Sequence, residues 1–208
     1  MRVLMVLARL VAGGAEVSAL RLVRALRPRG YEFVVAAMRG GGELTGAFRQ
    51  AGAEVREPLA RGRWDLPAAW RIARLCCCGV EALVVVDVPR NGLVCGLVGS
   101  LLSRRRMARL CWCKSVPGGQ SGPFAGLLRA AQRLGLLDAV VCAARHQRSA
   151  LVRRGLDRRR MPLVRNGVEA PRAGTWPADV PPPAGRGLLV HVANATADKD
   201  FPTLLAAA

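Results

Sequence analysis

The stretch that decides the fold is MRVLMVLARLVAGGAEVSALRLVRAL, residues 1–26. Residues 3–8 form a continuous apolar run, which is typical of a parallel strand covered on both faces. Gly13 and Gly14 follow, and glycine pairs commonly mark a turn. Apolar residues then recur every third or fourth position, so residues 15–28 are predicted to form an amphipathic helix. The stretch therefore predicts a strand, a glycine turn and a helix.

The opening run also resembles a signal peptide, but Arg9 ends the apolar stretch early and an amphipathic helix follows. Arg or Pro interrupts every other apolar stretch before it reaches membrane-spanning length. We therefore expect a cytoplasmic protein without a transmembrane segment.

Strand and helix patterns alternate along the rest of the chain. Further strands are predicted at residues 33–38, 54–59, 82–87, 107–113, 138–143 and 161–165. Further helices are predicted at residues 43–51, 66–78, 93–102, 123–136 and 146–154. Such alternation predicts an α/β fold with a doubly wound, Rossmann-like parallel sheet.

The composition changes after residue 169. Residues 170–186 are rich in proline and glycine, which predicts a linker between domains. Residues 187–208 then read as a new strand and the start of a helix that ends without a cap. We expect one Rossmann-like domain at residues 1–169 and an incomplete second Rossmann-like domain at residues 187–208.

The charge is strongly positive, with a formal net charge of +18 from 32 basic and 14 acidic residues. All but two of the basic residues are arginine, and they are spread along the chain, the densest runs being residues 104–106 and 158–160. Aromatic residues that could stack on bases make up only 4%. We therefore expect no nucleic-acid partner, although a polyanion is the simplest explanation of such a charge. Weak attraction to anionic lipid is a secondary expectation.

The cysteines point to free thiols. Their number is odd, and the chain contains neither a CxxC pair nor a Cys/His cluster at zinc spacing. We expect buried free thiols in a reducing compartment, and no metal site. The seven are Cys76, Cys77, Cys78, Cys95, Cys111, Cys113 and Cys142.

The turn at Gly13 and Gly14 is a candidate anion site. Ligands of doubly wound sheets bind at the carboxyl ends of the strands, where glycine lets the backbone approach a phosphate and a helix N-terminus offers free N–H groups. A plain strand-to-helix turn explains the same residues equally well. The segment is not GxGxxG, and no acidic residue ends the second strand, which argues against a dinucleotide cofactor.

Two later segments add polar candidates. Residues 164–169, VRNGVE, contain an Asn-Gly turn signal. Residues 192–205, VANATADKDFPTLL, place Asn194 and Lys199 between a predicted strand and helix. A lysine there can supply a point charge to a phosphate, or can be an ordinary exposed loop residue.

Together, these segments in this order resemble the retaining glycosyltransferases of family 4, which have the GT-B fold. The resemblance implies that Gly13 and Gly14 lie near the diphosphate of a nucleotide-sugar. It implies that Lys199 holds this diphosphate and that Asn194 stands where the family more often has Arg. The substrate-binding prediction is therefore Gly13, Gly14, Asn194 and Lys199, with no cofactor and no metal.

The chain also departs from the family pattern. The carboxylate pair E-x7-E of the donor domain is absent, and the stretch 110–115 lacks the histidine that many members carry. Of the two histidines, neither His146 nor His191 is expected to be catalytic, so the catalytic residues remain unassigned. Asp87 could contact an acceptor or cap the next helix, and residues 115–123 could form an acceptor-side loop or a flexible connection.

The expected function is hexosyltransferase-like: a sugar is transferred from a nucleotide-sugar to a glycan, lipid or small-molecule acceptor. The configuration of the sugar is expected to be retained. The resemblance places this chain as the acceptor-side domain plus a truncated donor domain, so we expect little activity from it alone. The expected location is the cytoplasm, with peripheral contact to the inner face of the membrane. The alternative is a non-catalytic Rossmann-type anion-binding module, or a subunit completed by a partner chain.

Overall fold

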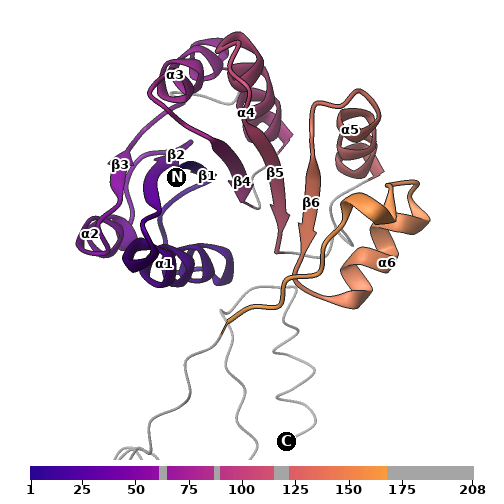
Figure 1. Ribbon diagram of the computed structural model, residues 1–208, viewed down its shortest axis with the longest axis horizontal. Coiled ribbons are helices and arrows are strands. Elements are labelled where there is room, and N and C mark those ends of the chain that lie inside the picture. The colour runs from indigo at the N-terminus through magenta and orange to yellow at the C-terminus, as the bar shows by residue number, and fades with distance from the viewer. Residues whose placement is uncertain (61–64, 87–89, 115–121, 168–208) are drawn as a thin grey trace, which may run out of the picture. The chain divides into compact units, whose positions relative to one another are not determined.

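The computed structural model of the chain describes residues 1–60, 65–86, 90–114 and 122–167. The chain divides into two compact units, Met1–Val168 and Glu169–Ala208, and the described residues all belong to the first. Strands and helices alternate along this unit (Figure 1). The elements are β1 (Arg2–Leu7), α1 (Gly14–Leu26), η1 (Arg27–Arg29), β2 (Glu32–Ala37), α2 (Leu44–Gln50), β3 (Glu54–Arg56), α3 (Leu66–Cys77), β4 (Ala82–Val86), α4 (Arg90–Leu102), β5 (Ala108–Cys113), α5 (Gly122–Arg133), β6 (Ala139–Cys142), α6 (Arg145–Arg153) and η2 (Arg158–Arg160).

The six strands of the described unit form one parallel sheet in the order β3-β2-β1-β4-β5-β6. From β1 the chain moves outward through β2 and β3, then returns to pair β4 with β1 and continues to β6 on the other side. Leu7 of β1 is level with Ala37 of β2 and Val86 of β4, so the three central strands end together. The predicted doubly wound, Rossmann-like sheet is therefore confirmed.

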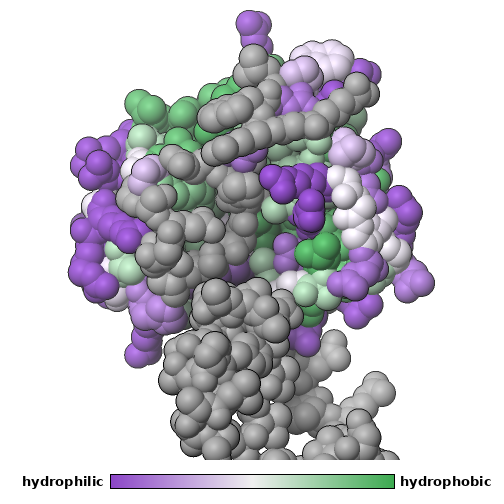
Figure 2. Space-filling model, turned by 180° about the vertical axis from the view of Figure 1, so that it is seen from behind, coloured by the Kyte–Doolittle hydropathy of each residue, from purple (hydrophilic) through white to green (hydrophobic). Residues whose placement is uncertain are grey.

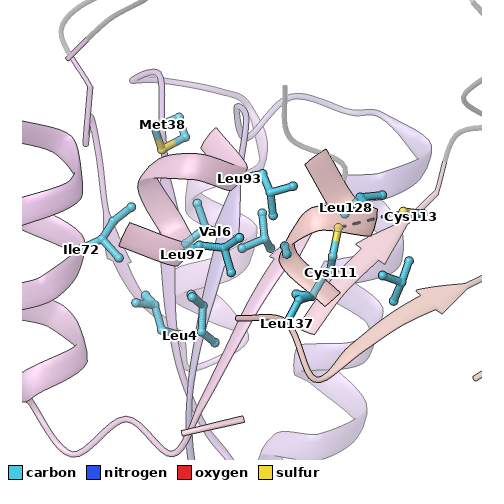
Figure 3. Close-up of a cluster of buried hydrophobic side chains, with 14 of the residues drawn as sticks. Leu4, Val6, Met38, Ile72, Leu93, Leu97, Cys111, Cys113, Leu128 and Leu137 are labelled. Atoms are coloured by element: carbon cyan, nitrogen blue, oxygen red, sulfur yellow. Dashed lines mark hydrogen bonds between the residues drawn. The ribbon is translucent and has the colours of Figure 1, made fainter. Parts of the chain in front are cut away.

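Side chains of β1 alternate between two buried clusters, one on each face of the sheet. Leu4 and Val6 enter the cluster that α3, α4 and α5 complete, drawn in Figure 3. Met5 and Leu7 enter the cluster on the face that α1 and α2 cover. All four side chains are fully buried. The opening run is continuous in apolar residues because both faces of its strand are covered, as predicted.

The third strand and the last predicted strand differ from the expectation. Residues 54–59 were expected as a strand, but β3 ends at Arg56, because the following Glu57–Pro58 places a residue without an N–H in the ladder. Residues 161–165 form only one bridge, between Leu163 and Cys142. Backbone hydrogen bonds from Cys142 to Pro162 O (3.0 Å) and from Val164 to Cys142 O (2.9 Å) hold this segment beside β6.

Two helix boundaries also shift. Helix α4 begins at Arg90, three residues before the expected start. The sequence pattern missed this first turn because residues 90–92 contain no apolar side chain. Helix α5 ends at Arg133 instead of residue 136, because Gly135 takes a left-handed conformation with φ 66° and closes a C-terminal cap. The N–H groups of Gly135 and Leu136 donate to Gln132 O and Ala131 O. Among the helices of the described residues, none has both the length and the apolar character needed to cross a bilayer.

The cysteines are free thiols, but only some are buried. Cys76, Cys111, Cys113 and Cys142 are buried, Cys95 is partly buried, and Cys77 and Cys78 at the end of α3 are exposed. Burial raises the pKa of Cys76 to about 12 and that of Cys142 to about 11. These two thiols therefore stay protonated at neutral pH. The expectation of buried thiols is wrong for Cys77 and Cys78. These two residues end the apolar stretch of α3 on a side of the helix that faces solvent.

Helix α4 approaches α3 and the sheet through glycines. A Cβ added at Gly99 would lie 2.6 Å from the Ala69 carbonyl oxygen and 2.7 Å from Ile72 Cγ2, both in α3. A Cβ added at Gly96 would lie 3.0 Å from Val85 Cγ2 in β4. The distances at Gly99 are shorter than real Cβ atoms show, and the distance at Gly96 is very tight. The two glycines therefore set how closely α4 packs against α3 and β4.

Candidate functional site at the carboxyl edge of the sheet

The carboxyl edge between β1 and β4 is where this topology places a ligand. The strand order reverses direction there, and in doubly wound sheets ligands bind outside the carboxyl ends of the strands at such a point. Residues 8–13 leave β1 at this edge and lead into the start of α1. The predicted residues Gly13 and Gly14 therefore lie at the expected place.

Gly13 and Gly14 leave the first turn of α1 open. Gly13 is the N-cap residue with extended φ and ψ of −121° and 162°, so its side chain gives no cap to the helix N–H groups. A Cβ at Gly14 would meet no atom within 4 Å, and one at Gly13 would meet only the carboxylate of Glu16. Neither glycine is demanded by backbone strain or internal packing. Their effect is an accessible helix N-terminus, which favours an anion.

The loop that follows β2 supports this turn. Gly42 packs so tightly against Leu10 that an added Cβ would overlap the Leu10 carbonyl group. The Leu44 N–H donates to Leu10 O (3.0 Å), and the Ala12 N–H donates to Glu43 Oε1 (2.7 Å). Residues 42–44 thus hold residues 10–12, and with them the position of Gly13.

The end of β5 carries a lysine on the same edge. The Lys114 ammonium lies 3.6 Å from the centroid of the Trp112 ring and donates to Asn166 Oδ1. Trp112 is 8% exposed, and its indole N–H has no acceptor among the described residues. Asn166 belongs to the Asn-Gly turn singled out in the sequence. The structure therefore joins the end of β5 to the Asn-Gly turn, 52 residues further along the chain, at one edge.

Gln147 holds this part of the edge together. Its side chain is 2% exposed, and its Oε1 accepts from the N–H groups of Ala143 (2.9 Å) and Ala144 (3.1 Å). Its Nε2 donates to the Lys114 carbonyl oxygen at 2.7 Å. Sequence reasoning missed Gln147, and the available signal was a glutamine in the first turn of the helix predicted at residues 146–154, where a side chain can bond the backbone N–H groups at the helix start.

Several other candidates do not join this site. Asn194, Lys199, Asp87 and His191 lie outside the described residues, as do residues 115–121. His146 is exposed on α6 and contacts none of the groups above in the described bonds. Within the part of the chain that the structure describes, no group of three or more His, Cys, Asp or Glu residues could hold a metal ion.

The end of β2 lacks the carboxylate of a dinucleotide site. Strand β2 ends at Ala37 and is followed by the buried Met38 and the exposed Arg39, whose N–H donates to Ala8 O. A dinucleotide-binding sheet has an Asp or Glu here that binds the ribose. In this respect the end of β2 differs from that of a nicotinamide- or flavin-binding sheet.

A cavity of about 340 Å³ lies at the opposite, amino edge of the sheet, between the end of α5 and η2. Arg129, Arg133, Arg160 and Asp157 are among its lining residues. The guanidinium of Arg160 donates to Gln132 O (3.1 Å), and the Asp157 N–H donates to Gln132 Oε1 (3.1 Å). These contacts join η2 to the end of α5, so the cavity is separate from the carboxyl-edge site.

Known structures resemble this unit in fold. No protein-family model matches the chain, and a search of curated proteins found no match. HepE of Anabaena, solved in complex with UDP-glucose, has a TM-score of 0.67 and 16% identity, covering 81% of this chain and 44% of that one. A glycosyltransferase of Rickettsia africae ESF-5 has a TM-score of 0.59 and 13% identity, with coverages of 80% and 43%. The lipopolysaccharide outer core galactosyltransferase WaaB, in its apo form, has a TM-score of 0.57 and 8% identity, with coverages of 81% and 46%.

Identities this low establish the fold and nothing finer. The chain spans less than half the length of each of these proteins. The described unit of this chain therefore has a Rossmann-like α/β fold of the kind found in glycosyltransferases.

Proposed function

We propose that the chain is the acceptor-side, amino-terminal part of a retaining glycosyltransferase with the GT-B fold, similar to family 4 and hexosyltransferase-like. Its donor is a nucleotide-sugar, and its acceptor is a glycan, lipid or small molecule. The observation that carries the proposal is the uncapped N-terminus of α1, opened by Gly13 and Gly14 at the point where the sheet reverses direction. The fold likeness to HepE, which was solved with UDP-glucose, supports a nucleotide-sugar ligand.

In this proposal the chain's own groups stabilise a departing diphosphate. The anomeric carbon exchanges its bond to the diphosphate oxygen for a bond to the acceptor oxygen on the same face of the ring, and the proton of the acceptor hydroxyl passes to the departing diphosphate. Negative charge then grows on the diphosphate, and the first-turn N–H groups of α1 face it with the positive end of the helix dipole. Gly14 permits close approach, whereas the Glu16 carboxylate beside Gly13 directs the anion toward the Gly14 side. Asn194 and Lys199 are proposed to bind the same diphosphate.

The 208-residue chain alone is expected to transfer little or no sugar, since it spans between 43% and 46% of the length of the proteins that it resembles in fold. The measurement is release of UDP from UDP-glucose by the purified chain, with glycan and lipid acceptors. Rapid, acceptor-dependent release would contradict this expectation. We also propose a cytoplasmic location with peripheral contact to the membrane.

Gly14→Asp is expected to weaken binding of UDP-glucose by at least about tenfold while leaving the fold intact, because it sets a carboxylate where the diphosphate approaches an open helix terminus. The measurement is calorimetric titration, with the thermal midpoint as the check on folding. Gly46→Asp is the matched control, because Gly46 lies exposed in the first turn of α2 and also has open space around it. Equal binding by both variants, or no binding by the wild type, would remove the role proposed for Gly14.

A further inference from the structure

Helix α4 exposes an apolar stripe where a surface helix normally exposes polar residues. Val94, Val98, Leu101 and Leu102 are 42%, 39%, 42% and 58% exposed, and they follow one another at helical spacing. We call these four residues the α4 stripe. The opposite side of the helix is also apolar, with Leu93 buried in the core. Helix α4 is therefore apolar all round although one side of it faces solvent.

The α4 stripe is not the side that packs on the rest of the domain. Gly99 faces α3, while Leu93 and Gly96 face the sheet. At 100° per residue these positions lie away from the stripe. In the view from behind, hydrophobic residues gather at the upper left of the domain, whereas hydrophilic residues are spread round the outline (Figure 2).

Positive charge adjoins the stripe. Arg104, Arg105 and Arg106 follow α4 directly and are all exposed. Residues 90–106 contain no Asp or Glu, so no carboxylate of this segment neutralises them. The surface thus combines exposed leucine and valine side chains with an adjacent run of arginines.

We propose that the α4 stripe and Arg104–Arg106 dock on an anionic membrane surface. The apolar side chains of the stripe lie among the lipid headgroups and upper acyl chains, and the guanidinium groups pair with lipid phosphates. A second copy of this chain fits less well. Residues 90–106 carry arginines and no carboxylate in both copies, so two paired α4 helices would offer the arginine runs no acidic partner within this segment. An anionic bilayer supplies both an apolar layer and the missing negative charge.

The test is sedimentation of the purified chain with vesicles of phosphatidylcholine alone or with an equal part of phosphatidylglycerol. We expect binding to the anionic vesicles and at least about tenfold weaker binding to the neutral ones. The stripe variant Val98→Ser/Leu101→Ser is expected to lose at least about tenfold in affinity. Its control is Val11→Ser/Val164→Ser, which removes valines that are 40% and 49% exposed outside α4 and is expected to change binding less than about twofold.

The arginines are tested by Arg105→Gln/Arg106→Gln against Arg21→Gln/Arg24→Gln, two exposed arginines of α1 on the other face of the sheet. Both variants lower the net charge equally, but only the first is expected to weaken binding, by at least about tenfold. Equal loss in both would show diffuse attraction of a +18 protein and would overturn the proposal. The proposal would also fail if anionic vesicles bind no protein. It would fail as well if the wild type is a dimer and the stripe variant is a monomer. None of these readouts depends on nucleotide-sugar binding.

Discussion

Replacing Gly99 by alanine is expected to destabilise the protein by about 2 kcal/mol or more, although glycine to alanine in a helix interior ordinarily stabilises by about 1 kcal/mol. The added Cβ would lie 2.6 Å from the Ala69 carbonyl oxygen and 2.7 Å from Ile72 Cγ2. A backbone carbonyl and a buried β-branched side chain cannot move aside locally, so α3 and α4 must separate. Urea unfolding followed by circular dichroism measures the change.

Gly126→Ala in α5 is the matched control, because a Cβ at Gly126 meets no atom within 4 Å. It is expected to raise the free energy of unfolding by about 0.5 to 1 kcal/mol, the gain from helix propensity alone. The two substitutions are chemically identical and are expected to differ in sign. Stabilisation of similar size by both would contradict the close α3–α4 contact.

Gly42→Ala is expected to lower the free energy of unfolding by about 3 kcal/mol and to weaken UDP-glucose binding as well. The new methyl group would overlap the carbonyl group of Leu10, whose side chain is fully buried. Residues 10–12 would have to shift, and with them the Ala12–Glu43 hydrogen bond and the turn at Gly13. Denaturant unfolding and calorimetric titration measure the two effects.

Gly46→Ala, four residues along, controls for the loss of a glycine in this region. Gly46 has no neighbour within 4 Å of an added Cβ and lies in α2, so its replacement is expected to be neutral or slightly stabilising. If Gly42→Ala unfolds at the same urea concentration as Gly46→Ala, the loop after β2 does not brace the turn after β1.

The sheet was predictable because its strands are buried on both faces. The apolar run at residues 3–8 admits few other structures, and the same holds for the apolar run at residues 82–86. The edge elements were less predictable. β3 stops at Arg56 and the segment around Leu163 makes a single bridge, because pairing at an edge depends on one neighbour and on proline positions rather than on periodicity.

Within the site, local patterns located Gly13 and Gly14 but not the contacts between distant segments. The turn after β1 could be placed because a parallel sheet brings all its carboxyl ends to one edge. The link from Lys114 to Asn166 spans 52 residues, and that from Gln147 to Lys114 spans 33. Such tertiary contacts leave no local periodicity in the sequence. The tight packing of Gly42 on Leu10 is hidden for the same reason, since a glycine-rich loop predicts only a turn.

The most direct test of the central claim, that the carboxyl edge binds the diphosphate of a nucleotide-sugar, is hydrogen–deuterium exchange of the 208-residue chain with and without saturating UDP-glucose. The first-turn amides of α1 have no side-chain cap, so bound phosphate oxygens would protect them. We predict slower exchange in residues 11–16 and no change in residues 155–160 at the amino-edge cavity. Unchanged exchange in residues 11–16, or slowing confined to residues 155–160, would contradict the claim.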